Sequence, residues 1–227
     1  MINFFVKGGV HMDLILRKFI HELRNPLTAL YSTVQLMEMR NSELKEMKYW
    51  PNLRYNIENI IQLINDFSDF TKCDTLSVEE FDAATFFQQL SLSFAAYIAD
   101  SEVEYSSKIS FINFKITGDK TKLQEVFWNL LKNAYEATLP KGQISLIVQD
   151  KKDRILVQIK DTGCGISSEE LPRIFEPFVT SKKNGTGLGL SICRQIIESH
   201  HGIIEVISEV GFGSTFSIEI PAKDCCQ

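Results

Sequence analysis

The segment His21–Leu27 places a histidine, a carboxylate and an amide within one helical turn, just ahead of a proline. An unperturbed imidazole has a pKa near ~6.5 and is largely neutral at pH 7, so an exposed His21 ring could accept a phosphoryl group. Glu22 could orient the ring and take the proton from its other nitrogen. Asn25 lies on the same helix face, where its amide could position a water. This chemistry is phosphoryl transfer to histidine, although a His-Glu pair alone is most often a surface pair.

The elements around His21 are predicted to be helices. Pro26 removes one backbone hydrogen bond and clashes with the Glu22 carbonyl, so a bend is expected there. A break is predicted at residues 49–52, where Pro51 suits the first turn of a second helix. Apolar residues recur at alternating steps of three and four on both sides of the break, which is typical of a bundle seam. They are Leu16, Ile20, Leu23, Leu27, Leu30, Val34 and Met37, then Leu53, Ile57, Ile60, Ile64 and Phe67.

Two such helices joined by a short connection predict an antiparallel hairpin over residues 13–76. One hairpin would expose its apolar stripe, so we expect a homodimer whose four helices share one core. His21 lies one residue beyond the seam position Ile20 and should face solvent.

A second domain is predicted over residues 77–223, with α+β character. Helices are expected at residues 81–97, 119–139 and 187–199, and Asp119 suits the N-cap of the second of these. Strands are expected at residues 115–117, 143–149, 154–160, 203–208 and 214–220. This pattern favours a sheet packed against helices.

Asn129 and Asn133 stand four residues apart on the second predicted helix, and therefore on one face. Their carbonyl oxygens suit Mg²⁺ together with phosphate oxygens and water. Leu130 and Leu131 should face the core. Two solvent-facing asparagines would be the commoner explanation if the pair stood alone.

Asp161 ends a predicted strand and begins a stretch that contains Gly163 and Gly165. Its carboxylate could accept from an adenine amino group, and the glycines would let the backbone approach the base. Such a stretch is by itself usually only a turn.

A second glycine-rich stretch, Gly185-Thr186-Gly187-Leu188-Gly189, leads into a helix, where backbone N–H groups and the helix N-terminus favour phosphate. It lacks the Gly-Lys-Ser/Thr ending of a P-loop and the preceding strand of a dinucleotide fingerprint. Lys182 and Lys183 could meet the phosphates or could be a solvated pair. The long connection before them is typical of a lid.

The bulk composition argues against several classes of protein. The 227 residues carry a net charge of -5 and no basic run, so nucleic acid is not expected as a partner. No apolar run reaches the ~20 residues of a membrane span, and no signal peptide is recognisable. The five cysteines have no metal-site spacing, which fits reduced thiols in the cytoplasm. Residues 1–12 are expected to be partly foreign to the native protein.

In this order the motifs resemble the sensor histidine kinases of two-component signalling, over residues 13–222. The segment around His21 is similar to the family's first box, residues 129–133 to its N box, residues 161–166 and 185–190 to its two glycine boxes, and residues 175–178 to its F box. The sequence around His21 is also similar to that of sporulation kinases of bacilli, which would imply a phosphorelay.

The resemblance implies a dimerisation and phosphotransfer hairpin followed by an ATP-binding domain of the gyrase/chaperone/kinase type. It implies ATP and Mg²⁺ as cofactors, and a response-regulator receiver domain as partner. Small protein inhibitors of the hairpin and a membrane anchor in the native full-length protein are also compatible with it. Carried over by position, His21 is the acceptor, Glu22 its acid–base partner and Asn25 the residue linked to phosphatase activity. Asn129, Asn133, Asp161, Thr215 and the glycine-box residues Gly163, Gly165, Lys182, Lys183, Gly185, Gly187, Leu188 and Gly189 would hold Mg·ATP.

Two alternatives stay open at this point. A gyrase- or chaperone-type ATPase needs a glutamate to activate water where this chain has Asn129, and it does not need the helical seam. A phosphotransfer or scaffold protein of the same fold would have weak or no kinase activity, against which the intact glycine boxes argue. The chain also departs from the family at Ile20, where a serine is frequent, and at Ala134–Ala137, where a frequent basic residue is missing.

Overall fold

The computed structural model describes residues 9–70, 76–110, 114–182 and 185–224. These residues fall into two compact units. One lies within Met1–Lys72 together with Thr180–Leu188, and the other within Cys73–Val179 together with Gly189–Gln227.

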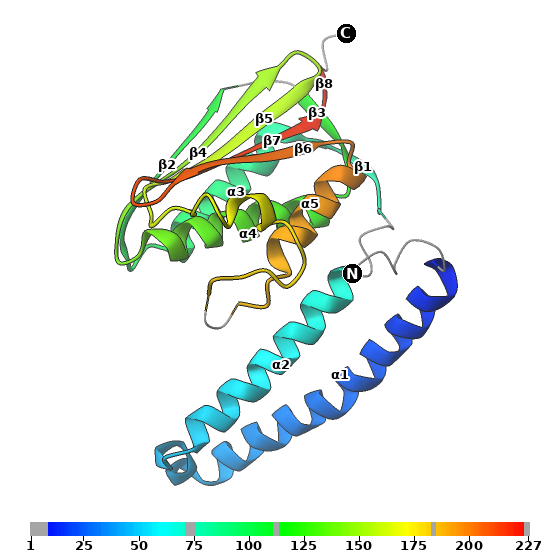
Figure 1. The fold of residues 1–227 in the computed structure, drawn as a ribbon, viewed down its shortest axis with the longest axis vertical. Helices are drawn as coiled ribbons and strands as arrows, with labels where there is room; N and C mark the ends of the chain where they lie inside the picture. The colour runs from blue at the N-terminus through cyan, green and yellow to red at the C-terminus, as the bar shows by residue number, and fades with distance from the viewer. Residues whose placement is uncertain (1–8, 71–75, 111–113, 183–184, 225–227) are drawn as a thin grey trace. The chain divides into compact units, whose positions relative to one another are not determined.

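The first unit contains the predicted helical hairpin. Helix α1 spans Gly9–Arg40 and α2 spans Trp50–Phe70, and the two helices contact each other (Figure 1). Helix α1 continues through Pro26. The first helix ends earlier than predicted, at Arg40, because Asn41 caps the short 3-10 helix η1 (Ser42–Glu46) by accepting from the Glu43 N–H at 3.1 Å.

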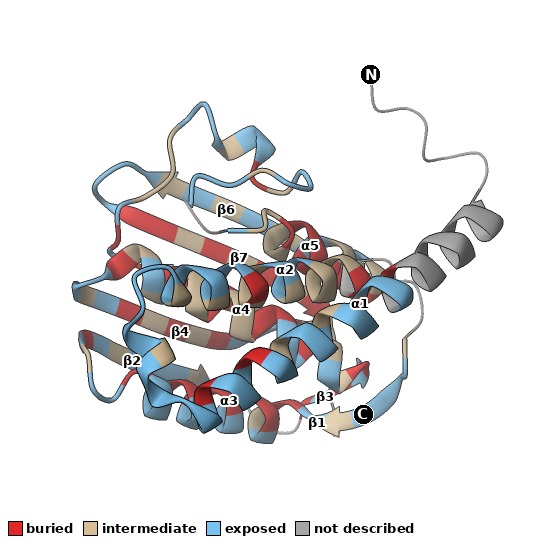
Figure 2. Cartoon of the chain, turned by 90° about the horizontal axis from the view of Figure 1, so that it is seen from below, coloured by how far each residue is buried: buried red, intermediate tan, exposed pale blue. Residues whose placement is uncertain are grey.

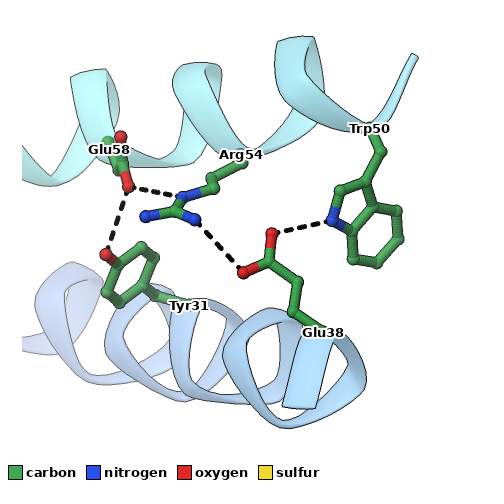
Figure 3. A network of polar contacts seen from close by, with 5 residues as sticks. All are labelled: Tyr31, Glu38, Trp50, Arg54 and Glu58. Atoms are coloured by element: carbon green, nitrogen blue, oxygen red, sulfur yellow. Dashed lines mark hydrogen bonds and ion pairs between the residues drawn. The ribbon is translucent and has the colours of Figure 1, made fainter. Parts of the chain in front are cut away.

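A polar network joins the two helices near their connection (Figure 3). Glu38, only 8% exposed, accepts hydrogen bonds from Trp50 Nε1 at 2.9 Å and Arg54 Nη1 at 3.2 Å. Glu58 Oε1 accepts from Arg54 Nε at 3.0 Å and from the Tyr31 hydroxyl at 3.1 Å. Because these hydrogen bonds form only where the donors of one helix lie opposite the acceptors of the other, this network favours one register of α1 against α2.

The apolar stripe of the hairpin is only partly covered within the chain. Ile20, Val34 and Ile57 are buried, whereas Leu30 and Ile60 remain 47% and 45% exposed. Large apolar side chains left at the surface in one continuous stripe are typical of an interface with another chain. The homodimer nevertheless stays a prediction.

The second unit is an α+β sandwich, as predicted, in which helices cover one face of a five-stranded sheet (Figure 1). The sheet order is β2-β4-β5-β7-β6, and a smaller sheet has the order β1-β3-β8. The helices are α3 (Ala83–Tyr97), α4 (Lys120–Thr138) and α5 (Gly189–Ser199), with a 3-10 turn η2 at Leu171–Arg173. The strands are β1 (Glu79–Asp82), β2 (Glu102–Ser110), β3 (Phe114–Gly118), β4 (Lys141–Lys151), β5 (Arg154–Asp161), β6 (Ile203–Glu209), β7 (Gly213–Pro221) and β8 (Lys223–Asp224).

Alternation along the central strands builds the core of this unit. In register, Leu146 of β4 faces Ile159 of β5, and Val157 of β5 faces Ile218 of β7; all four are fully buried. Figure 2 shows an alternation of buried and intermediate positions along β7. The opposite layer comes from fully buried residues of α3 and α4: Phe87, Phe94, Leu123, Phe127, Leu130 and Leu131.

Several predicted elements need correction. The sequence does not reveal β2, because residues 102–110 are mostly polar and only Val103 is buried; the strand exists through parallel pairing with β4. The helix expected from Phe81 begins at Ala83, since Phe81 pairs with Ile116 in β1–β3 and Asp82 caps the helix. The last helix begins at Gly189 instead of residue 187. Within the described residues, no helix is both long and apolar enough to cross a bilayer.

Candidate functional site

Helix α4 carries the two predicted asparagines, and its start is fixed by a buried polar cluster. Asp119 caps the helix by accepting from the Lys122 N–H at 3.0 Å and the Ser77 N–H at 2.8 Å. The Asp119 N–H donates to His200 Nε2 at 2.9 Å, and His200 Nδ1 lies 2.7 Å from the Ile196 carbonyl oxygen. His200 therefore uses Nε2 as acceptor and Nδ1–H as donor, which is the neutral imidazole. Burial lowers the pKa of His200, in agreement with that state.

The same face of α4 reaches Gly189 and the first glycine-rich stretch. Asn129 Nδ2 lies 3.4 Å from Cys193 Sγ of α5, and a Cβ on Gly189 would come within 2.6 Å of that amide. Two turns later the Ala137 carbonyl accepts the Cys164 N–H at 3.0 Å. Asn133, half-buried, occupies the turn between them. Residues 129, 133 and 137 thus form one row on the helix, with Gly189 at one end and the first glycine-rich stretch at the other.

Asp161 is 2% exposed at the end of β5. Its Oδ1 accepts from the Gly163 N–H at 2.8 Å and from the Ser214 N–H at 3.2 Å. Within the described part of the chain, Oδ2 receives no hydrogen bond, so it remains the acceptor available to a ligand. Burial raises the pKa of Asp161, while the two backbone donors act in the opposite direction.

The first glycine-rich stretch is held against the end of β6. Gly165 has φ +71°, and a Cβ there would overlap the Glu209 carbonyl oxygen, so only glycine fits. Thr215 of β7 pairs with Lys160, the residue before Asp161, which brings Thr215 beside the same strand end. Asp161, Gly163, Gly165 and Thr215 therefore lie near one end of the sheet.

Ser214 and Ala137 were missed by the sequence reasoning. Ala137 could have been found, since it continues the four-residue spacing of Asn129 and Asn133. Ser214 gives no local signal. It lies 53 residues from Asp161 in the sequence, and the hydrogen bond between them depends on the register of β5 against β7.

The second glycine-rich stretch is divided between the two units. Gly189 begins α5, whereas Lys182, Gly185, Gly187 and Leu188 belong with the hairpin unit. Within that segment Lys182 is exposed and Leu188 is fully buried. Lys183 lies outside the described residues.

The predicted phosphoacceptor segment lies on α1. Glu22 and Asn25 are exposed, and the backbone of His21 is helical, while the side chain of His21 is outside the described part of the structure. Ile20, the seam residue before it, is buried, which agrees with the predicted phasing of the helix.

Two family descriptions match this chain. Residues 14–75 match the His Kinase A (phospho-acceptor) domain, and residues 118–224 match the histidine kinase-, DNA gyrase B- and HSP90-like ATPase family. Sporulation kinase C of Bacillus subtilis (strain 168) is 31% identical over 210 residues, which are 89% of this chain and 47% of that protein. This chain spans about half or less of the length of curated relatives that it matches.

Solved structures agree with both the fold and the sequence match. Full-length ShkA in complex with AMPPNP aligns over 94% of this chain and 46% of its own, with a TM-score of 0.80 and 25% identity. The catalytic domain of histidine kinase ThkA aligns over 64% of this chain and 95% of its own, with a TM-score of 0.59 and 32% identity. ThkA in complex with the response regulator TrrA aligns over 91% of this chain and 60% of its own, with a TM-score of 0.66 and 26% identity. The chain belongs to the histidine kinases, and it consists of a phospho-acceptor hairpin followed by a domain of the ATPase type.

Proposed function

We propose that this chain is a catalytic core that uses ATP to phosphorylate its own His21 and passes the phosphoryl group to an aspartate of a response regulator. The observation that carries the proposal is the row on α4, where Asn129 lies against Gly189 and Ala137 binds the first glycine-rich stretch, with Asn133 between them. That stretch begins at the buried Asp161, whose Oδ2 is open to a ligand. The asparagine amides suit the metal of a bound nucleotide, the glycine-rich backbone suits its phosphates, and the carboxylate suits its base.

In this proposal Asp161 Oδ2 accepts a hydrogen bond from the adenine amino group, and Thr215 lies close to the base. The amide oxygens of Asn129 and Asn133 are hard donors that suit Mg²⁺, which would neutralise phosphate charge when bound. The phosphates would meet Lys182, Lys183 and the backbone of the second glycine-rich stretch: Gly185, Gly187, Leu188 and Gly189.

The transfer step needs positioning more than new covalent chemistry. One imidazole nitrogen of His21 forms a bond to the γ-phosphorus while the bond from that phosphorus to the bridging oxygen of ADP breaks. Glu22 accepts the proton from the other ring nitrogen, which keeps charge from accumulating on the imidazole.

The partners follow from the hairpin. ThkA has been solved with a response regulator, and its likeness to this chain supports a receiver domain as the phosphoryl acceptor, docked on the hairpin near His21. The exposed apolar stripe supports a homodimer. Asn25 is exposed one turn after His21, where its amide could direct water in a phosphatase reaction. The likeness to sporulation kinases supports a phosphorelay, in which small protein inhibitors of the hairpin could also act, and we expect the reaction in the cytoplasm, where ATP is made.

The test is incubation with γ-labelled ATP, comparing the wild type with His21→Ala and Asn133→Asp. His21→Ala should abolish labelling while ADP affinity stays unchanged, because His21 is not among the residues proposed to hold the nucleotide. Asn133→Asp should weaken Mg·ADP binding, since it places negative charge beside phosphate. Full labelling of His21→Ala would contradict the proposal.

A further inference from the structure

The turn between β6 and β7 holds the first glycine-rich stretch through contacts outside the recognised motifs. The Ile166 N–H donates to Ser208 Oγ at 2.8 Å, and the Gly211 N–H donates to the Cys164 carbonyl at 2.8 Å. Between them Gly165 lies against the Glu209 carbonyl so closely that no side chain fits. The stretch therefore takes its shape from this hairpin as well as from its own glycines.

Ser208 is the hub of these contacts. Its hydroxyl accepts from Ile166, donates to the Gly213 carbonyl at 2.9 Å and lies 2.9 Å from Ser214 Oγ. Since its one proton goes to Gly213, the contact with Ser214 has Ser214 as the donor. A serine hydroxyl has one donor and two acceptor positions, so every position of Ser208 is in use.

The hub connects both ends of the stretch. Ser214, which bonds to Ser208 through its hydroxyl, donates its backbone N–H to Asp161 Oδ1 at 3.2 Å. Ser208 thus holds Ile166 directly and Asp161 through Ser214. With Oδ1 engaged in this way, Oδ2 of Asp161 is the oxygen left to meet a ligand.

We propose that Ser208 is a positioning residue for recognition of the nucleotide base, acting through Ser214 and Asp161. The inference rests on the proposed function, since it assigns Asp161 to the adenine amino group. A binding group is effective only if neighbouring hydrogen bonds fix its orientation before the ligand arrives, and Ser208 supplies that support from β6. Binding of the phosphate groups, which are held by other residues, should not depend on Ser208.

The matched variants are Ser208→Thr and Ser208→Val, which have the same shape and differ in the hydroxyl. Both are β-branched and suit a strand, so both should fold. Ser208→Val should raise the dissociation constant for ADP and the KM for ATP in autophosphorylation roughly three- to tenfold, the effect of losing hydrogen bonds of ordinary strength. The kcat at saturating ATP should stay unchanged, and Ser208→Thr should keep wild-type values.

Each outcome separates this inference from the proposed function. A wild-type chain that fails to bind ADP would overturn the proposed function itself. A wild type that binds ADP, with Val and Thr variants that bind it equally well, would overturn the role of Ser208 alone. A Val variant that lowers kcat without raising KM would also overturn it, because a residue that orients the base acts on nucleotide affinity.

Discussion

At the residue scale, the chemistry depends on a few side chains whose surroundings set their state. Asp161 is buried, and its pKa is raised by that burial, yet two backbone N–H groups favour the ionised carboxylate. In the proposed site, the ionised form is the better acceptor for the adenine amino group. The residue types were predictable, because an acid at a strand end before glycines is visible in the sequence. The bonds that orient it were not, since Ser214 reaches Asp161 across the sheet.

Asp161→Asn tests the base contact. The variant keeps the shape of the side chain but removes the charge, and its amide N–H₂ group would meet the adenine amino group donor to donor. We expect ADP affinity to fall at least roughly tenfold, as for the loss of a hydrogen bond to a charged group. Calorimetric titration with ADP measures the effect.

Asp153→Asn is the matched control for this substitution, because Asp153 is exposed in the β4–β5 turn. It should bind ADP like the wild type. Equal affinities for wild type and Asp161→Asn would contradict the role of Asp161.

At the scale of elements, α4 carries Asn129, Asn133 and Ala137 of the candidate site. Its four-residue spacing could be predicted from the sequence, and so could its N-cap Asp119, because both are local patterns. The strand β2 could not be predicted, since its polar sequence becomes a strand only by pairing with β4. The sheet order likewise depends on contacts between distant segments, which local periodicity does not encode.

His200 ties the end of α5 to the start of α4 and makes the stability of the second unit depend on pH. Its pKa is lowered by burial, so between that value and the ordinary value near 6.5 the unfolded chain binds more protons than the folded one. Stability should therefore fall as pH drops through about 6.5, and level off below the folded-state pKa. The charged groups around the ring are Asp119, Lys122 and His201.

Urea unfolding between about pH 5.5 and 7.5 measures this dependence. The fluorescence of Trp128 in a Trp50→Phe background reports on the second unit alone, because these are the two tryptophans of the chain. His200→Gln should lower stability and flatten the pH dependence. The control His201→Asn, at an exposed position with φ 56°, should keep the dependence. A slope unchanged in His200→Gln would show that another group is responsible.

At the scale of the whole molecule, the exposed stripe on the hairpin predicts a second copy of the chain. The alternating spacing of apolar residues revealed this stripe in the sequence, and the structure leaves Leu23, Leu30, Leu53 and Ile60 exposed along it. The register of the hairpin was not predictable, because it depends on the network of Glu38, Arg54 and Glu58 between two helices.

Leu30→Glu should convert the dimer to a monomer. Burying a leucine contributes about 1.5–3 kcal/mol, and a symmetric dimer loses two of them. Light scattering of the wild type should give twice the mass of one chain, and the variant the mass of one. Ser32→Glu adds the same charge at an exposed polar position of α1 and should leave the dimer intact. A monomeric wild type at micromolar concentration would contradict the prediction.

The most direct test of the central claim is to locate the phosphoryl group after reaction with ATP. The protein is incubated in parallel with γ-labelled and α-labelled ATP, digested under alkaline conditions, and its peptides are sequenced by mass spectrometry. The account predicts label from the γ-phosphate alone, on the peptide that contains His21 and on the imidazole of that residue. Label on another residue, or none in a preparation that binds ADP, would contradict it.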